Sequence, residues 1–399
     1  MTPSVDWGYE PGRERTAVST PAVGAEIAPT LRRAVGGFAT RVVEYRPGPG
    51  QFSASGMFNN PARALGAPVT GTPDAPDNSK VVSLGRLGGS ITLGFDGAVA
   101  DLPPTASNPH GLDAIVFGNA FYVGGDPERW WAEAGVIEIA RDIDGDGSPD
   151  GGWYVIAAPG RPRPRAVTRV YRRADFPAAQ WPAWAAGLEE FQLSGYVAER
   201  VSGGPPIQVS DPIPAGLADA TPMVLLGDTD ADGLVDWPGV APEMFYGRPA
   251  DPFSVDPVTR WRGGGGGDGF AIEWAIDPVT GLAPSPRLGG FELVRVSTAA
   301  EGSVGLFGEV STEVGGVSRV VAGPSADVAD ALGRPWPDGV VDAADLVAFV
   351  TAFAQGDVRI ADTADGSGRT AGDGGGPDGF LDAVDMVVFL TVFVEGGAL

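Results

Sequence analysis

The sequence predicts a mainly β protein, an antiparallel β-sandwich or jelly roll followed by a small α-helical domain at the C-terminus. Short β-like runs separated by turn residues begin near residue 41, and the chain combines 61 Gly and 37 Pro with 43% hydrophobic residues, as loop-rich β proteins do. Two apolar patterns of helical period near the end of the chain predict the helical domain. We therefore divide the chain into a disordered lead-in at 1–40, a β module at 41–322 and a tandem repeat at 323–399.

The β module is expected to consist of short antiparallel strands. The first candidate, Val42–Tyr45, precedes a Pro-Gly-Pro-Gly turn, and Val81–Phe95 is expected to form a hairpin around Gly85–Gly89. Further candidates follow along the chain: Ala114–Phe121, Val136–Arg141, Trp153–Ala157, Met223–Leu226, Phe270–Ile276 and Phe291–Ser297. No long amphipathic helix lies among them, and strands without alternating helices favour an antiparallel sandwich or jelly roll.

Charge and composition exclude several functions. The formal net charge of −24 argues against nucleic-acid binding, which needs a basic face, and suits a highly soluble protein that binds cations. The chain has no cysteine, so neither disulfides nor thiol chemistry are available. The chain has a single histidine, His110, which lies in a turn-like string. Because there is only one, Ser-His, Cys-His and multi-His zinc arrangements are excluded unless His110 takes part.

Two uninterrupted Asp-rich loops in the β module predict calcium sites. Calcium loops of the EF-hand kind take oxygens from positions 1, 3, 5, 7, 9 and 12, with Gly at position 6. The loops at 142–150 and 228–236 fill positions 1, 3, 5, 6 and 9, whereas position 12 is Trp153 in one and Gly239 in the other. Clustered carboxylates repel one another unless a divalent cation neutralises them, and hard oxygens in a flexible loop favour calcium. The predicted ligands are Asp142, Asp144, Asp146, Asp150, Asp228, Asp230, Asp232 and Asp236. The alternative is a solvated Asp/Gly turn between strands.

The end of the chain repeats one loop-and-helix unit. Asp338-Gly-Val-Val-Asp342-Ala-Ala-Asp345 recurs as Asp378-Gly-Phe-Leu-Asp382-Ala-Val-Asp385, and each copy runs into apolar residues at helical spacing. The acids of both copies match the later positions of a calcium loop, and two acidic leads lie upstream across Gly/Pro-rich inserts. The predicted ligands are Asp327, Asp330, Asp338, Asp342, Asp345, Asp362, Asp365, Asp378, Asp382 and Asp385. The alternative is that Asp342 and Asp382 are helix N-caps.

These two loops, each followed by one short apolar helix, resemble the dockerin domain, and more closely the insert-bearing variant that ends many bacterial surface proteins. Dockerins are calcium-dependent pairs of half EF-hands that dock onto cohesin modules in cellulosomes. The resemblance implies calcium as cofactor and a cohesin-like or surface-anchoring partner. The loop positions that often carry small hydroxyl residues in cohesin-binding dockerins are Ala343-Ala344 and Ala383-Val384 here, which leaves the partner open.

Five segments of the β module are similar to a family of bacterial cell surface proteins. They are residues 82–93, residues 113–122, the loop at 142–150 running into Trp153-Tyr154, residues 272–278 and residues 307–313. Other members of this family carry PKD-type or dockerin-type appendages. The resemblance implies a location and a modular architecture rather than an activity.

The location of the protein is predicted indirectly. Residues 1–40 show no basic segment followed by an apolar one, and no later run approaches a membrane span. Taken alone, this indicates a cytoplasmic protein. Weak calcium sites are filled outside the cell, however, where modules bind with dissociation constants of roughly 10⁻⁴ to 10⁻³ M. We therefore expect an extracellular or cell-surface protein whose leader is not visible in this chain.

Aromatic side chains in Pro/Gly-rich segments are candidates for binding a glycan, because flat exposed rings suit sugar rings. They are Trp130, Trp131, Trp181, Trp184 and Trp261. The alternative is that these rings cover the sandwich core. The segment Arg161–Arg173 carries six arginines, which would hold an anionic glycan or pair with the carboxylates of the protein itself.

We therefore expect an exported, calcium-binding surface protein with a non-catalytic β module, for which carbohydrate is a candidate ligand. The alternative is a polysaccharide-active glycoside hydrolase, or an accessory component of a polysaccharide-degrading complex. Such an enzyme needs two carboxylates, and the first to test are Glu133, Glu273, Glu309 and Glu313, which lie in β segments with aromatic neighbours. Their spacing assigns none of them a catalytic role.

Overall fold

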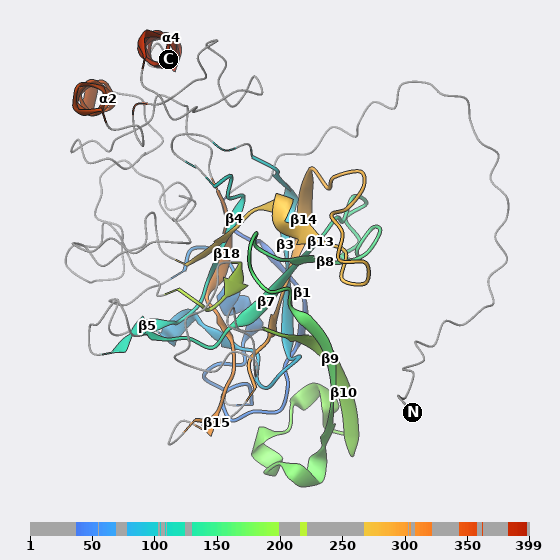
Figure 1. Cartoon of the computed structure of the whole chain (residues 1–399). Coiled ribbons are helices and arrows are strands. Elements are labelled where there is room, and N and C mark those ends of the chain that lie inside the picture. The colour runs from blue at the N-terminus through green and yellow to red at the C-terminus, as the bar shows by residue number, and fades with distance from the viewer. Residues whose placement is uncertain are drawn as a thin grey trace, which may run out of the picture. The chain divides into compact units, whose positions relative to one another are not determined.

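The computed structural model describes residues 37–54, 56–68, 78–102, 104, 108, 110–123, 130–198, 216–221, 267–301, 303–304, 308–320, 343–356, 361 and 382–396. These residues all belong to the second of two units into which the chain divides, Arg32–Leu399. This part of the chain is mainly β, as predicted, with antiparallel sheets and two α-helices, α2 (Ala343–Gln355) and α4 (Ala383–Gly396) (Figure 1).

The largest sheet has seven strands in the order β1-β3-β14-β7-β8-β13, with β11 paired to β7. The strands are β1 (Arg41–Arg46), β3 (Ser90–Ala100), β14 (Gly290–Thr298), β7 (Gly135–Ala140), β8 (Tyr154–Ile156), β13 (Ala275–Ile276) and β11 (Leu217–Ala218). Their pairings are all antiparallel, and Figure 1 shows β3, β14 and β7 side by side. β14 and β7 are buried along nearly their whole length. In β7, Ile137 and Ile139 belong to one hydrophobic cluster and Val136 to another, so both faces of the strand are covered, which explains its apolar sequence.

A three-stranded sheet shares its hydrophobic core with the large sheet. Its strands are β12 (Asp268–Phe270), β4 (Ala114–Phe117) and β18 (Gly316–Arg319), with β4 in the centre. Phe270 of this sheet and Phe291 of the large sheet are both fully buried, and their ring centroids lie 5.8 Å apart. Leu93 and Val317, one from each sheet, belong to the same cluster. The apolar faces of the two sheets are therefore buried in one core.

The remaining described strands form four two-stranded pairs. They are β9 (Arg165–Arg172) with β10 (Glu190–Val197), β2 (Val82–Ser83) with β17 (Glu313–Val314), β5 (Phe121–Tyr122) with β6 (Trp130–Trp131), and β15 (Ser303–Val304) with β16 (Gly308–Glu309). Short 3-10 helices lie between strands: η1 (Pro61–Ala64), η2 (Asn78–Lys80), η4 (Arg173–Asp175), η5 (Ala178–Gln180), η6 (Ala183–Ala185) and η7 (Ile272–Trp274).

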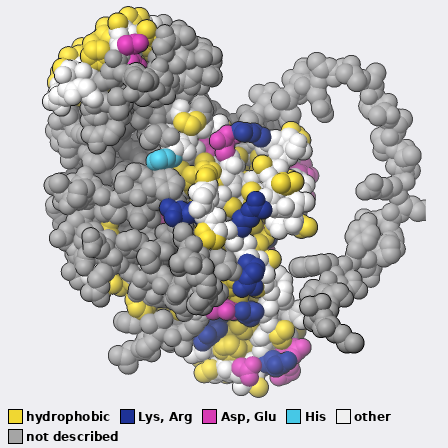
Figure 2. Space-filling view, in the orientation of Figure 1, with side chains coloured by type: hydrophobic (Ala, Val, Ile, Leu, Met, Phe, Trp, Pro, Cys, Tyr) yellow, Lys and Arg dark blue, Asp and Glu magenta, His cyan; other side chains and the backbone are white. Residues whose placement is uncertain are grey.

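β9 lies entirely within the arginine-rich segment Arg161–Arg173, and it is a strand that the sequence did not predict. Two of its arginines pair with carboxylates of the chain itself, Arg169 with Glu301 and Arg172 with Glu190. For these two arginines the self-pairing alternative is confirmed. Figure 2 shows Lys and Arg side chains scattered over the described part of this face, with no continuous basic patch there.

The hairpin predicted over Val81–Phe95 is wrong. β2 pairs with β17, whereas β3 pairs with β1 and β14, so the two segments belong to different sheets. The turn between them is held by other neighbours instead. Gly85 and Gly88 adopt left-handed φ values of 70° and 82°, and a Cβ on Gly88 would lie 3.0 Å from the Cβ of Leu193 in β10. The turn between β2 and β3 therefore packs closely against β10.

Four of the other predicted strands are confirmed, one is interrupted and one lies outside the described residues. β1, β7, β8 and β14 confirm four predictions to within a few residues. The strand predicted over Phe270–Ile276 is interrupted by η7, where the N–H of Ile272 donates to Oδ2 of Asp113 at 2.6 Å instead of to a neighbouring strand. The strand predicted at Met223–Leu226 and the lead-in up to residue 36 lie outside the described residues.

The helices α2 and α4 pack on each other through equivalent positions of the repeat. The rings of Phe349 and Phe389 stack with centroids 3.8 Å apart and planes inclined by 11°, and both side chains are fully buried. Phe353 and Phe393 stack on them from the next turn of each helix. The predicted helical pattern is thus confirmed in both copies. Neither helix is long and apolar enough to cross a membrane, and no other described helix is.

Candidate metal sites

The Asp142–Asp150 loop brings three of its four predicted ligands together. One carboxylate oxygen from each of Asp142, Asp144 and Asp146 lies within 4.8 Å of the other two. Asp142 is buried at the end of β7, whereas Asp144 and Asp146 are exposed. The fourth residue, Asp150, closes the loop, because its Oδ2 accepts a hydrogen bond of 2.6 Å from the N–H of Ile143.

The loop backbone supports this convergence. Gly147, at the predicted position 6, has a φ of 85° and donates its N–H to both oxygens of Asp142 at 3.2 Å. Asp144 and Asp146 each accept a hydrogen bond from the N–H two residues further on, at 3.1 and 2.6 Å. These bonds hold the carboxylates in place, and they would also stabilise a turn without an ion.

Asp142 links the loop to the large sheet. Its Oδ2 lies 2.6 Å from Nη2 of Arg41 in β1, and its N–H donates to Oε2 of Glu292 in β14 at 2.9 Å. Arg141 fixes the same Glu292 through two bonds of 2.9 and 3.1 Å. Arg41 neutralises one carboxylate of the loop, so a cation would be bound mainly by the charge of Asp144 and Asp146.

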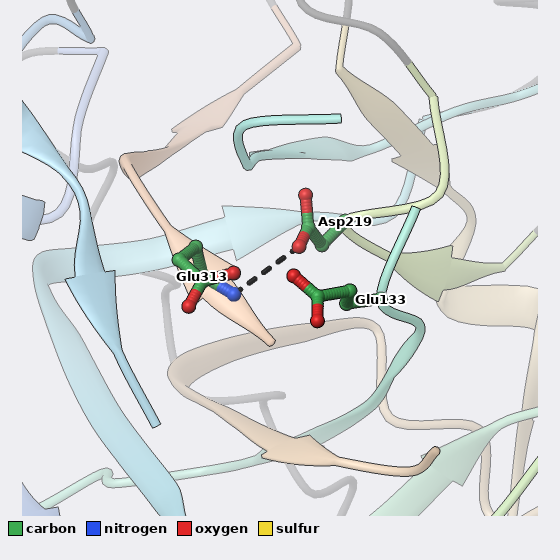
Figure 3. A group of neighbouring side chains, drawn as sticks. All are labelled: Glu133, Asp219 and Glu313. Carbon is green, nitrogen blue, oxygen red and sulfur yellow. Dashed lines mark hydrogen bonds between the residues drawn. The ribbon is translucent and has the colours of Figure 1, made fainter. Parts of the chain in front are cut away.

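A second group of carboxylates comes from three distant parts of the chain. Glu133 precedes β7, Asp219 follows β11 and Glu313 begins β17. One oxygen from each lies within 4.8 Å of the other two, and Figure 3 shows the three carboxylates turned toward one another. Asp219 is 0% and Glu313 is 5% exposed, while Glu133 is half-buried. We call these three residues the buried triad.

Backbone N–H groups hold Asp219 from two sides. Its Oδ1 accepts hydrogen bonds from Asn119 and Ala120 at 2.9 and 3.0 Å, and its Oδ2 accepts one from the N–H of Glu313 at 3.2 Å (Figure 3). The close approach requires glycine at position 118, because a Cβ there would lie 2.3 Å from Oδ1 of Asp219. The backbone that follows β4 therefore approaches the carboxylate of Asp219 closely enough to donate two hydrogen bonds to it only because residue 118 is glycine.

Ser311 connects the two glutamates of the buried triad. Its N–H donates to Oε1 of Glu133 at 3.2 Å, and its hydroxyl donates to Oε1 of Glu313 at 3.0 Å. The other oxygen of Glu313, Oε2, is buried without a hydrogen-bond partner among the described residues. A buried carboxylate oxygen in this state is costly unless a proton or a cation reaches it.

Burial raises the pKa of Asp219 and of Glu313 well above the usual values, and the neighbouring Glu133 charge raises both further. Hydrogen bonds to Asp219 from Glu313 and Asn119, and to Glu313 from Ser311, act in the opposite direction. Within the described part of the chain, no arginine or lysine forms an ion pair with Asp219 or Glu313. Asp219 and Glu313 therefore need bound protons or a cation to offset their charge.

Two of the four glutamates proposed as catalytic candidates, Glu133 and Glu313, thus lie together. Glu273 lies elsewhere, exposed and paired with Arg287, and the side chain of Glu309 lies outside the described residues. Asp219 was missed, because a lone aspartate 94 residues before Glu313 in the sequence carries no local signal.

The acids of the C-terminal repeat are described in part. Oδ1 of Asp382 accepts the N–H of Val384 at 2.6 Å, and Oδ2 of Asp385 accepts the N–H of Asp382 at 3.0 Å, a reciprocal cap at the start of α4. Asp345 and Asp385 are both buried at the start of their helices. The N-cap alternative is therefore observed for Asp382. The other predicted ligands lie outside the described residues: Asp228, Asp230, Asp232, Asp236, Asp327, Asp330, Asp338, Asp342, Asp362, Asp365 and Asp378.

Two of the tryptophans proposed as sugar-binding residues, Trp181 and Trp184, pack on other side chains of the protein. Trp181 is only 6% exposed and donates its Nε1–H to the carbonyl of Ala185 at 2.7 Å, so the expectation of an exposed ring is wrong there. Trp184 is half-buried, and both rings pack on Phe191 at 4.8 and 4.5 Å between centroids. Trp131 is half-buried in β6, whereas the side chain of Trp130 and all of Trp261 lie outside the described residues. Trp181 and Trp184 contribute to a small hydrophobic cluster with Phe191 that is separate from the core shared by the two sheets.

No family model matches the chain, and no curated protein sequence matches it.

Proposed function

We propose that this chain is a calcium-binding protein of the cell surface with a non-catalytic β module, in which the Asp142–Asp150 loop is a structural calcium site. The convergence of Asp142, Asp144 and Asp146 within 4.8 Å is the observation that carries this proposal. Carboxylate oxygens in a flexible loop suit calcium, whose ligands lie about 2.3–2.6 Å from the ion. Gly147 turns the backbone where a calcium loop requires it.

An ion in this loop would act on stability rather than on chemistry. Asp142 is fixed to β1 and β14 through Arg41 and Glu292, so binding would tie the exposed end of the loop to the large sheet. At a calcium concentration tenfold above the dissociation constant, the stabilisation is about 1.4 kcal/mol. The exposure of Asp144 and Asp146 favours an affinity of the weak, extracellular kind, roughly 10⁻⁴ to 10⁻³ M.

The proposal includes a β-sandwich and a C-terminal attachment domain. The core shared by the seven-stranded and three-stranded sheets supports the sandwich. The stacking of Phe349 on Phe389, at equivalent positions of the repeat, supports a duplicated dockerin-like domain. Its partner would be a cohesin-like or surface-anchoring module.

A hydrolase is less well supported. Glu133 and Glu313 lie together, but a glycosidase needs both carboxyl groups beside a substrate-accessible bond, and Glu313 is 5% exposed. The packing of Trp181 and Trp184 likewise removes two of the proposed sugar platforms. Within the described residues, no observation favours a glycan ligand over calcium alone.

Calorimetric titration of the full chain with calcium, after chelation and dialysis, tests the loop. The double variant Asp144→Asn/Asp146→Asn should lose one weak binding event that the wild-type chain shows. Asp175→Asn, which changes an exposed aspartate outside the loop, should titrate as wild type. Identical titrations of the wild type and the double variant would refute the loop as a calcium site.

A further inference from the structure

We propose that the buried triad of Glu133, Asp219 and Glu313 is a second, internal site for a hard divalent cation, with calcium as the first candidate. The site is built from tertiary structure and does not depend on the Asp142–Asp150 loop. Its three carboxylates lie on segments that precede β7, follow β11 and begin β17. A bound ion would join these segments inside the protein.

The spacing of the oxygens fits such an ion. One oxygen from each residue lies within 4.8 Å of the other two. Two ligands on opposite sides of calcium are about 5 Å apart, so three oxygens at this spacing leave room for one ion between them. An all-carboxylate set favours calcium, magnesium or manganese over metals that prefer nitrogen or sulfur.

The unpartnered oxygen of Glu313 is an independent observation that points to a ligand. Both oxygens of Asp219 and Oε1 of Glu313 accept hydrogen bonds, whereas no described donor reaches the buried Oε2 of Glu313. Figure 3 shows this carboxylate facing those of Asp219 and Glu133. A carboxylate oxygen retained in this position has a clear role if it coordinates an ion.

The charge balance supports the same assignment. Asp268 is a fourth buried acid near the buried triad and adds to the electrostatic repulsion on Asp219. A divalent cation would offset two of these negative charges in a region where water is largely excluded. The rival explanation is a proton shared between Glu133 and Glu313, as in paired carboxyl groups elsewhere. The two explanations predict opposite effects of removing one charge.

The test compares the full wild-type chain with Glu313→Gln, which keeps the side-chain shape and removes one charge. Asp144→Asn is the matched control, because it removes an acid from the exposed loop and leaves the buried triad intact. Each protein is dialysed against metal-free buffer, and its metal content is measured by mass spectrometry. The wild type and Asp144→Asn should retain one equivalent of calcium or another hard divalent ion that Glu313→Gln lacks.

Thermal melting then distinguishes the ion from the proton. With calcium present, Glu313→Gln should melt at a lower temperature than the wild type. With a chelator present, it should melt at the same or a higher temperature, because it has lost a repulsive charge and no ion. A wild-type chain that retains no metal, or a Glu313→Gln variant at least as stable as wild type under both conditions, would overturn the proposal. If Glu313→Gln fails to fold, the metal content of the wild type and of Asp219→Asn decides.

Discussion

Replacing Gly118 by alanine should destabilise the protein through one contact, that with Asp219. Gly118 does not adopt a left-handed φ, so alanine adds no backbone strain of its own. Its Cβ would, however, lie 2.3 Å from Oδ1, 2.8 Å from Cγ and 2.9 Å from Cα of Asp219. Real Cβ contacts essentially never fall below 3.0 Å, so the segment after β4 or the turn at Asp219 must move.

The magnitude follows from what that movement disrupts. Overpacking of a buried site costs about 1–3 kcal/mol. The same shift lengthens the hydrogen bonds from Asn119 and Ala120 to Oδ1 of Asp219, and losing one of them costs about 1 kcal/mol more. The free energy of unfolding should therefore fall by about 2–4 kcal/mol.

Urea unfolding followed by tryptophan fluorescence measures this loss, with Gly187→Ala as the matched control. Gly187 is exposed, its φ is not left-handed, and no described atom lies within 4 Å of an added Cβ. Alanine there should leave stability unchanged or raise it by up to about 1 kcal/mol. Equal unfolding midpoints for the two variants would refute the tight contact between Gly118 and Asp219.

Two further substitutions test buried charges elsewhere. Burial raises the pKa of Asp113 to about 8, although hydrogen bonds from the N–H groups of Ile272 and Leu102 lower it. Between pH values of about 4 and 8 the folded state therefore binds one proton more than the unfolded state, so the protein loses stability as the pH rises through this range. Asp113→Asn should remove that loss, which is about 1.4 kcal/mol per pH unit between pH 5 and 7 and is measured by urea unfolding. Parallel plots of unfolding free energy against pH for the wild type and the variant would instead show that Asp113 is ionised in the folded state. Glu138→Gln should lower the free energy of unfolding by about 3–5 kcal/mol in the same assay, because Glu138 of β7 holds Arg295 of β14 through hydrogen bonds of 2.6 and 2.7 Å. A loss below about 1 kcal/mol would contradict this.

The strands that the sequence predicted are those with apolar runs. Nearly all side chains of β7 and β14 are buried, so the apolar pattern of these strands is plain in the sequence. β9 was missed because it is mostly exposed and its arginines bind partners outside the strand. Strand partners were harder still to predict, since β2 and β3 are adjacent in sequence yet pair in different sheets.

The candidate sites divide in the same way. The carboxylates of Asp142, Asp144 and Asp146 lie in one loop, so their spacing in the sequence already predicted that they converge. The buried triad has no such spacing. Glu133 and Glu313 drew attention through their aromatic neighbours, and nothing local marks Asp219, which becomes a partner only when β4, β11 and β17 come together.

The loop takes its ligands from adjacent residues and the buried triad takes them from distant segments, so a bound ion would have a different effect on stability at each site. A loop whose ligands are contiguous retains some affinity for calcium in the unfolded chain, which reduces the stabilisation of the folded state. The buried triad exists only after distant segments have met, so an ion there would bind the folded state almost exclusively and its binding energy would add to folding. Chelation should therefore lower the free energy of unfolding of the whole protein mainly by removing an ion from Glu133, Asp219 and Glu313. Loss of an ion from Asp144 and Asp146 should mainly affect the exposed loop itself.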